Sequence, residues 1–334
     1  MGEYKGLKGF KVKSLATDPT TDLGQMWYDT GSNTLQFDGV GNGAWATGTS
    51  VPLGVQGAAS FGHSVNASGF CGGQSQANIG EGTNQTTSWS YNGSAWTEEA
   101  AINTMFRAAG GWGTSTAAMK AGGLQVPSAE IYNGVSWTTQ PTTVSRNGCA
   151  GGGTITAAIV VGGEPGPRLD CEEWNGTGWT EIANITTLRA EYGVTNQGTP
   201  TAFQIMGGSP PLERVETEQY NGTAWTEVGD LNFGRSLLGS GGTIPGAIVY
   251  GGVYSNPPVS YLVTNATEVW NGSSWTETGD LSTARQYIAP SNANSSATAS
   301  VCIAGANKPV NHSVNANVEE WDGAPAGVQT VTLS

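Results

Sequence analysis

The sequence contains few of the side chains that most catalytic and metal sites require. Among 334 residues there are two histidines, His63 and His312, and neither has ligand spacing around it. The four cysteines form no CxxC pair, so we expect buried free thiols rather than a zinc or redox centre. Ser-His-Asp, GxSxG and phosphate-loop signatures are missing too. We therefore expect a protein that is not an enzyme and holds no metal or cofactor.

Helical periodicity and long apolar segments are also absent. No window places apolar residues at i, i+3, i+4 and i+7, whereas short runs rich in Val, Ile, Thr and aromatic residues lie between clusters of Gly, Asn, Pro and Ser. There is no apolar run long enough for a membrane span, and the first residues lack the apolar core of a signal peptide. The sequence therefore predicts an all-β protein without membrane insertion.

Positive charge is scarce and unevenly placed. The net charge is −13, which repels nucleic-acid phosphates and anionic lipid, so we expect no nucleic-acid binding. An N-terminal arm, residues 1–23, differs from the rest because its first 13 residues carry a net charge of +3 and leave −16 elsewhere. We expect this arm to bind a partner by strand addition or charge attraction. Its basic residues are Lys5, Lys8, Lys11 and Lys13.

Glycine, tryptophan and an internal repeat dominate what is present. The 51 glycines and 12 tryptophans are far above average, and a segment of the form aromatic-Asn-Gly-x-x-Trp recurs. The copies are YNGSAW at 91, YNGVSW at 132, WNGTGW at 174, YNGTAW at 220, WNGSSW at 270 and a decayed WDGAPA at 321. Apolar stretches that end in Gly-Gly or Ala-Gly, such as GTITAAIVVGG, alternate with these copies.

Each unit predicts four strands, and four strands at this period are typical of a β-propeller blade, because a single four-stranded sheet buries both faces only between two neighbours. We expect six blades, or seven if residues 24–49 and the C-terminal strand share an extra one. A strand from one terminus should complete a sheet begun at the other, and GVQTVTLS, TLQFDG and AWATG are the available segments. Asn-Gly should supply the left-handed positions of tight hairpins, with the flanking aromatic residues packed together.

The Gly-Gly after an apolar strand, followed by an aromatic residue and then Trp, resembles the kelch repeat over about residues 50–325. The resemblance implies a β-propeller in which the glycine-ended strand lies inside each blade. It implies no single activity, because kelch propellers serve as scaffolds, adhesins and enzymes. The chain departs from the usual pattern in placing Trp only five residues after the aromatic residue, and in a last copy that lacks the Trp.

Several charged and aromatic residues recur with the repeat, which favours structural roles. We expect the tryptophans to fill the blade interfaces and the arginines to form ion pairs between blades with one glutamate series. The arginines are Arg107, Arg146, Arg189, Arg235 and Arg285, and the tryptophans are Trp96, Trp137, Trp179, Trp225 and Trp275. One glutamate series is Glu130, Glu173, Glu218, Glu268 and Glu320, and the other is Glu98, Glu181, Glu227 and Glu277.

The segments between Gly-Gly and the next aromatic residue are longest in the first, fifth and sixth units, at residues 74–88, 253–267 and 306–317. In a closed ring of six these units are neighbours, so their loops should gather on one side of one face, as binding surfaces of repeat proteins do. The expected ligand face, with a host-surface glycan as the candidate ligand, comprises Tyr254, Tyr261, Asn265 and His312.

The segment ahead of the repeats has hairpin patterns around DTGSN and FDGVGNG. With the phrases WYDT and SNTL and the run into kelch-like units, this opening resembles the start of structural proteins of tailed bacteriophages from marine and other environmental samples. The resemblance implies a location in the virion, other capsid or tail proteins as partners, and homo-oligomers as an option on a particle with repeated sites. Residues 24–49 would be an anchoring hairpin, and residues 50–334 the propeller.

The expected function is therefore that of a non-enzymatic virion structural protein, exposed on the particle as a capsid decoration, tail accessory or host-surface adhesin. The alternatives are a glycan-binding module, a polysaccharide-degrading propeller and an intracellular scaffold of the kelch type. Glycoside hydrolysis would need two carboxylates at a defined separation. The carboxylates outside the repeat positions are Glu81, Glu164, Asp170 and Glu213.

Overall fold

The computed structural model describes residues 13–15, 26–30, 34–39, 43–75, 83–123, 127–165, 168–195, 199–210, 212–256, 259–289, 298–307, 314–323 and 327–330. Over these ranges the chain forms strands, turns and loops but no helix, and hence no helix there that could cross a membrane. The chain divides into two compact units, a small one of Met1–Gly43 with Gly323–Ser334 and a large one of Ala44–Asp322.

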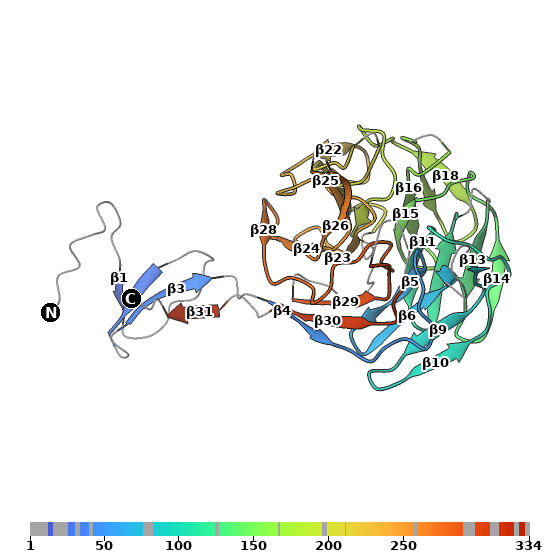
Figure 1. Ribbon diagram of the computed structural model, residues 1–334. Coiled ribbons are helices and arrows are strands. Elements are labelled where there is room, and N and C mark those ends of the chain that lie inside the picture. Colours follow the sequence, from blue (N-terminus) through green and yellow to red (C-terminus); the bar gives the residue numbers. More distant parts are fainter. Residues whose placement is uncertain are drawn as a thin grey trace. The chain divides into compact units, whose positions relative to one another are not determined.

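The large unit is a β-propeller of six small antiparallel sheets, or blades (Figure 1). Blade 1 has β5 (Ala59–Ser64), β6 (Ala67–Cys71), β9 (Ser88–Tyr91) and β10 (Trp96–Glu99), and blade 2 has β11 (Gly110–Thr114), β12 (Ala117–Ala121), β13 (Ala129–Tyr132) and β14 (Trp137–Gln140). Blade 3 has β15 (Ala150–Gly153), β16 (Ala158–Val161), β17 (Cys171–Trp174) and β18 (Trp179–Ile182), and blade 4 has β19 (Gly193–Val194), β20 (Phe203–Met206), β21 (Thr217–Tyr220) and β22 (Trp225–Glu227). Blade 5 has β23 (Gly239–Thr243), β24 (Gly246–Tyr250), β27 (Thr267–Trp270) and β28 (Trp275–Glu277), and blade 6 has β29 (Ala299–Ile303), β30 (Val318–Asp322) and β4 (Ala44–Thr47).

The blades form a closed circle. The innermost strands β5, β11, β15, β19 and β23 are neighbours in that order, and β29 of blade 6 contacts both β23 and β5. The inner edge of blade 6 begins at Ala289, whose backbone bridges Ile303 of β29. The predicted six-bladed, all-β propeller is confirmed.

The N-terminal strand β4 closes the ring by forming the outer strand of blade 6. It pairs antiparallel with β30, and Trp45 lies opposite Trp321 with the ring centroids 5.4 Å apart. Trp321 is the aromatic residue of the decayed last copy, so Trp45 supplies the tryptophan that this copy lacks. Of the segments expected to close the ring, AWAT (β4) does so, whereas GVQT near the C-terminus is not part of the propeller.

The small unit is a sheet of the order β1-β2-β3-β31, formed by β1 (Lys13–Leu15), β2 (Met26–Asp29), β3 (Thr34–Gly39) and β31 (Gly327–Thr330). β2 and β3 form a hairpin, and β31 pairs antiparallel with β3. The division of the chain thus differs from the expected one at two points. β4 belongs to the propeller although it precedes residue 50, and β31 belongs to the small unit, because each follows its hydrogen-bonding partner.

The aromatic-Asn-Gly-x-x-Trp segments form the outer hairpins. In each full copy the aromatic residue and the Trp are cross-strand partners, with ring centroids 5.0–5.4 Å apart. Only the glycine adopts the left-handed conformation, for example Gly222 at φ +92°. The Asn instead caps a four-residue loop. The side-chain oxygen of Asn221 accepts hydrogen bonds from the backbone N–H groups of Thr223 and Ala224.

The Gly-Gly pairs bend the chain out of the second strand of each blade and join it to the next blade. The second glycine donates its N–H to a carbonyl that lies ahead of the following blade, as Gly208 does to Arg235 at 2.8 Å. The same bond closes the ring, since Gly305 of blade 6 donates to Val55 ahead of blade 1. Both glycines have positive φ, and in blade 6 Ala304 takes the first position at φ +53°.

Four of the repeat arginines are fully buried and form ion pairs, as expected, but within a blade rather than between blades. Each pairs with a glutamate on the third strand of the sheet that follows it, and donates to two backbone carbonyls at the base of the Gly-Gly loop. Arg189, for instance, donates to the carbonyls of Gly207 and Glu216. The pairs are Arg146–Glu172, Arg189–Glu218, Arg235–Glu268 and Arg285–Glu319.

Arg107 and two of the expected glutamates were assigned wrongly. Arg107 is exposed, because in blade 2 the buried position that an arginine fills ahead of blades 3 to 6 is taken by Phe106. The cation that pairs with Glu130 is instead Lys120 of β12, at 3.1 Å. The Lys120 ammonium group lies over the Phe106 ring. Glu172 and Glu319 form the pairs instead of Glu173 and Glu320. Side chains two residues apart share a strand face, and Glu172 and Glu319 lie two residues before the buried Trp174 and Trp321.

The core lies between blades. One cluster, for example, packs Phe61 and Cys71 of blade 1 against Tyr132 and Trp137 of blade 2. Trp137, Trp225 and Trp275 are buried, and Trp96 and Trp179 are half-buried, so the interface role of the tryptophans holds. All four cysteines are buried and free, as expected.

Candidate functional site

One face of the propeller carries the longest loops. In an antiparallel four-stranded blade, the loop between the second and third strands emerges at the same end as the segment that leads to the next blade. We call this end the connector face. The described parts of the predicted long loops lie on it, in the neighbouring blades 5, 6 and 1. Two of them contain hairpins, β7 (Gln74–Ser75) with β8 (Thr83–Asn84) and β25 (Val253–Asn256) with β26 (Val259–Val263).

At the centre of this face, six residues form a closed ring of backbone hydrogen bonds, which we call the axial ring. Each N–H donates to the carbonyl of the ring residue in the preceding blade, at 2.8–3.0 Å, and the last bond joins blade 1 to blade 6. The ring residues are Gly57, Ala108, Gly148, Glu191, Leu237 and Tyr287, and all have φ between +50° and +61°.

Four of the ring positions are not glycine, although a left-handed backbone costs an L-residue about 1–2 kcal/mol. Their side chains are thereby held at the axis. Glu191 and Tyr287 are the two with polar groups, and both are half-buried. Strained positions of this kind cluster at functional sites, which makes the axis the first place to look for one.

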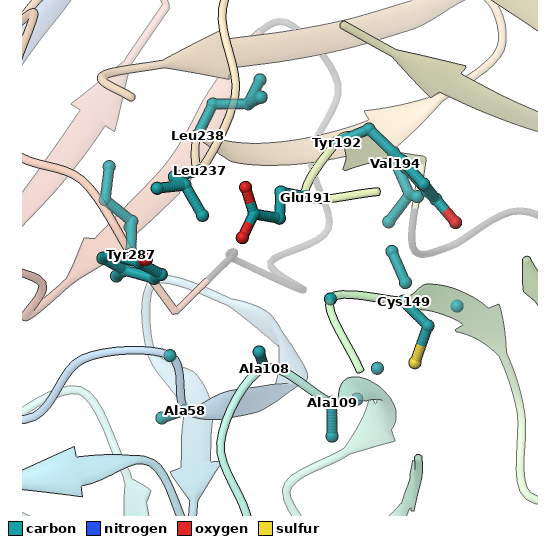
Figure 2. A pocket seen from close by; sticks show the side chains of 17 residues that line it. Ala58, Ala108, Ala109, Cys149, Glu191, Tyr192, Val194, Leu237, Leu238 and Tyr287 are labelled. Carbon is teal, nitrogen blue, oxygen red and sulfur yellow. The ribbon is translucent and has the colours of Figure 1, made fainter. Parts of the chain in front are cut away.

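Two cavities adjoin the axial ring and share Gly57, Ala108, Glu191 and Tyr287 as walls. The inner cavity has a volume of about 80 Å³ and is lined mainly by glycine, alanine and aliphatic residues of the innermost strands. Figure 2 shows the Glu191 carboxylate pointing into it. The second cavity, which we call the axial mouth, has a volume of about 40 Å³ and is lined by Gln56, Gly57, Arg107, Ala108, Asn147, Glu191 and Tyr287.

The electrostatics of the axial mouth are dominated by carboxylates. Burial raises the pKa of Glu191 above its ordinary value, and the Glu164 and Glu213 carboxylates raise it further. A 3.3 Å hydrogen bond from Ser209 and the charge of Arg107 oppose the shift. Glu191 forms no ion pair within the described parts of the chain. Three carboxylates and one guanidinium group therefore act at the mouth, so negative charge exceeds positive charge there.

Two tyrosines lie close to this charge. Burial, followed by the negative charge of Glu191, raises the pKa of Tyr287 to about 12, so its hydroxyl is neutral at physiological pH. Tyr261 contributes to the same shift and is 59% exposed at φ +59°. The ring of Tyr287 thus adds aromatic surface beside the Glu191 carboxylate, and Tyr261 lies near Tyr287.

The expected ligand face is brought together only in part. Tyr261 is exposed near the axis, but Tyr254 is half-buried against Phe233, with ring centroids 5.8 Å apart. Asn265 donates to the carbonyl of Leu281 at 3.1 Å and so fastens a blade connection. His312 lies outside the described residues.

Exposed apolar side chains gather on the connector face. Six large hydrophobic side chains are exposed among the residues with described side chains. Met105, Val144 and Leu188 lie in blade connections, and Leu212 and Tyr261 lie in Gly-Gly loops. Only Val135, in an outer hairpin turn, lies at the opposite end.

The carboxylates considered for glycoside hydrolysis are not brought together in one site. Glu164 and Glu213 act on Glu191 at the axis, whereas Asp170 is held by Arg168 at 2.9 Å. Glu81 lies outside the described residues. The described parts of the chain contain no group of three or more His, Cys, Asp or Glu side chains arranged to hold a metal.

The arm lysines have no described side-chain environment. Lys5, Lys8 and Lys11 lie outside the described residues, and Lys13 begins β1 opposite Trp27. Conversely, sequence reasoning did not single out Glu191, Tyr287 or Gln56. The available signal was position, because Glu191 and Tyr287 each follow a repeat arginine by two residues.

Comparison with known proteins adds no assignment to this geometry. No protein-family model matches the chain, and no curated protein is significantly similar to it.

Proposed function

We propose that the protein is a non-enzymatic structural component of a tailed-phage particle, in which the small unit attaches the chain and the propeller carries a binding surface. The observation that supports this proposal most is connectivity. The chain leaves the small unit at Gly43, runs through all six blades and returns at Gly323. Both ends of the propeller are thus fastened to one sheet, in which β3 and β31 are neighbours. A propeller tethered at both ends suits display on a particle.

The use of the carboxylates favours a binding role over hydrolysis. Five glutamates are committed to buried cations at structurally equivalent places in blades 2 to 6, which leaves them unsuited to proton transfer. The small unit is the expected attachment site because it includes the basic arm, whereas the chain beyond residue 13 carries −16. The phage-like opening supports the same proposal. The number of copies per particle distinguishes attachment to the capsid from attachment to the tail.

Quantitative mass spectrometry of gradient-purified particles tests the proposal. We expect a fixed ratio of this chain to the major capsid protein, with hundreds of copies for a capsid decoration and a few for a tail part. A second experiment compares the full chain with a variant that lacks residues 1–20. The variant should fold, because the propeller begins at Ala44, but should no longer bind particles. Absence of the chain from particles would discard the proposal in favour of a glycan-binding module, an enzyme or an intracellular scaffold.

A further inference from the structure

The axial mouth combines several groups that favour a cation. Glu191 supplies a desolvated carboxylate, and the nearby Glu164 and Glu213 outweigh the one positive charge, Arg107. The ring of Tyr287 lines the same cavity, and aromatic faces attract cations through their quadrupole. Each of these groups comes from a different blade or loop, so they meet only at the axis.

Gln56 provides an independent sign that the axial mouth can receive a hydrogen-bond donor. Gln56 is only 7% exposed, and it lines the axial mouth. The amide nitrogen donates to Gln74 at 3.0 Å, but the amide oxygen has no hydrogen-bond partner in the described structure. An acceptor buried without a donor retains the cost of its lost hydration. A ligand that carries N–H groups would remove this cost.

The surroundings of the mouth favour a protein as the source of the cation. Met105, Leu188 and Tyr261 are exposed on the same face, and exposed apolar and aromatic side chains that share one face are typical of a protein-binding surface. A guanidinium group fits the centre better than an ammonium does. It is planar, stacks on aromatic rings and presents five donors to several acceptors at once.

We propose that the axial mouth binds the arginine side chain of an extended segment from a partner protein. The guanidinium group would donate to the Glu191 carboxylate and to the Gln56 amide oxygen, and would lie against the Tyr287 ring. The apolar residues of the connector face would contact the flanking residues of the segment. This proposal does not depend on the virion role, since an arginine-bearing partner could belong to a particle, a host surface or a cell.

The test uses the full chain and the peptide acetyl-Gly-Ser-Leu-Arg-Leu-Ser-Gly amide. Its control is the same peptide with citrulline, which matches arginine in shape but has no charge. Calorimetric titration should show binding at least about tenfold tighter for the arginine peptide, the factor that a charge-assisted hydrogen bond of about 1.5 kcal/mol provides. In backbone NMR, the arginine peptide should shift the amide signals of the axial ring, including Gly57 and Gly148.

Two variants locate the site. Glu191→Gln should bring the affinity for the arginine peptide to within about threefold of that for the citrulline peptide. The matched change Glu181→Gln, at an exposed position on β18, should leave the tenfold preference intact. Equal binding of both peptides, no binding at millimolar concentration, or an unchanged preference in Glu191→Gln would each overturn the proposal. Binding of host glycan in place of the peptide, abolished by Glu191→Gln, would do so as well.

Discussion

At the residue scale, the axial ring holds side chains where the backbone does not favour them. Ala108, Glu191, Leu237 and Tyr287 adopt left-handed geometry at positions where Gly57 and Gly148 show that glycine is accommodated. Glu191 adds the cost of a carboxylate moved out of water. Local costs that persist in one place are expected where a site is preorganised for a ligand.

The substitution Glu191→Gln should therefore stabilise the fold near pH 7. The folded-state pKa of Glu191 is raised, so its ionisation opposes folding, and the loss of stability sets in as the pH rises from the unfolded-state pKa through the folded one. The gain from Gln should vanish below about pH 4, where the carboxyl is protonated in both states. Urea unfolding of both proteins at pH 7 and pH 4 measures this. A variant that is less stable at pH 7 would contradict it.

Close packing of strands makes other glycines indispensable. A methyl group at Gly239 would lie 2.1 Å from the ring of the buried Tyr250, whereas one at Gly178 would meet nothing within 4 Å. We expect Gly239→Ala to lower the free energy of unfolding by at least about 2 kcal/mol through overpacking. Gly178→Ala should change it by less than about 0.5 kcal/mol. Thermal and urea unfolding of the pair checks this, and equal effects would show that Tyr250 moves freely.

At the element scale, a glutamate on the third strand fastens each blade from 2 to 6 to the connection that enters it. The second oxygen of Glu268 accepts the backbone N–H of Asn232, and Glu218 accepts that of Thr186 in the same manner. Because the arginine also binds the base of the Gly-Gly loop, one buried pair holds three segments. Blade 1 dispenses with the pair, since Val55 takes the arginine position and packs in one cluster with Trp89.

Breaking one pair should cost more than replacing it. Arg189→Met leaves the fully buried Glu218 without a cation, and we expect a loss of about 3–5 kcal/mol. The double variant Arg189→Met with Glu218→Leu should be more stable than this single variant, because no buried charge is left unpaired. Denaturant titration of the single and double variants decides the matter. A double variant that loses the sum of both single losses would contradict the explanation.

At the scale of the whole molecule, the ring depends on contacts between its two ends. Trp45 of β4 packs on Tyr250 at 4.8 Å and on Trp321, and its indole nitrogen donates to Thr267 of blade 5. The axial ring and the bond from Gly305 to Val55 close the circle at the centre. Blade 6 is thus held by strands from both ends of the propeller.

Removal of the Trp45 side chain should open this closure first. In Trp45→Ala, amide hydrogen exchange measured by mass spectrometry should speed up in β4 and β30, with a loss of about 3 kcal/mol in stability. Trp179→Ala, which removes the corresponding half-buried ring from blade 3, should leave protection in blade 6 unchanged. Faster exchange spread evenly over all blades in Trp45→Ala would show that β4 is not a special point of closure.

From the sequence, the repeat predicted six blades, with a seventh as the alternative, and it predicted the outer hairpins, the Gly-Gly bends and the aromatic pairs. Each of these depends on residues that are close in the chain and recur. Alternation along a strand would also have selected Glu172 and Glu319. The sequence could not predict that Phe106 and Lys120 take the place of Arg107 in blade 2. Arg107 lies one residue after the buried position of the connection, and its side chain is therefore exposed.

The way in which the ring closes, and the place where its charges meet, follow only from the folded chain. Trp45 and Trp321 are far apart in the chain, and so are Gln56 and Tyr287, which become neighbours only when blade 6 meets blade 1. Each blade contributes one residue to the axial ring, so no single stretch of the sequence contains the axial mouth. The carboxylate of Glu191 and the unpaired amide oxygen of Gln56 come together there because the segments that lead into the six blades meet at one axis.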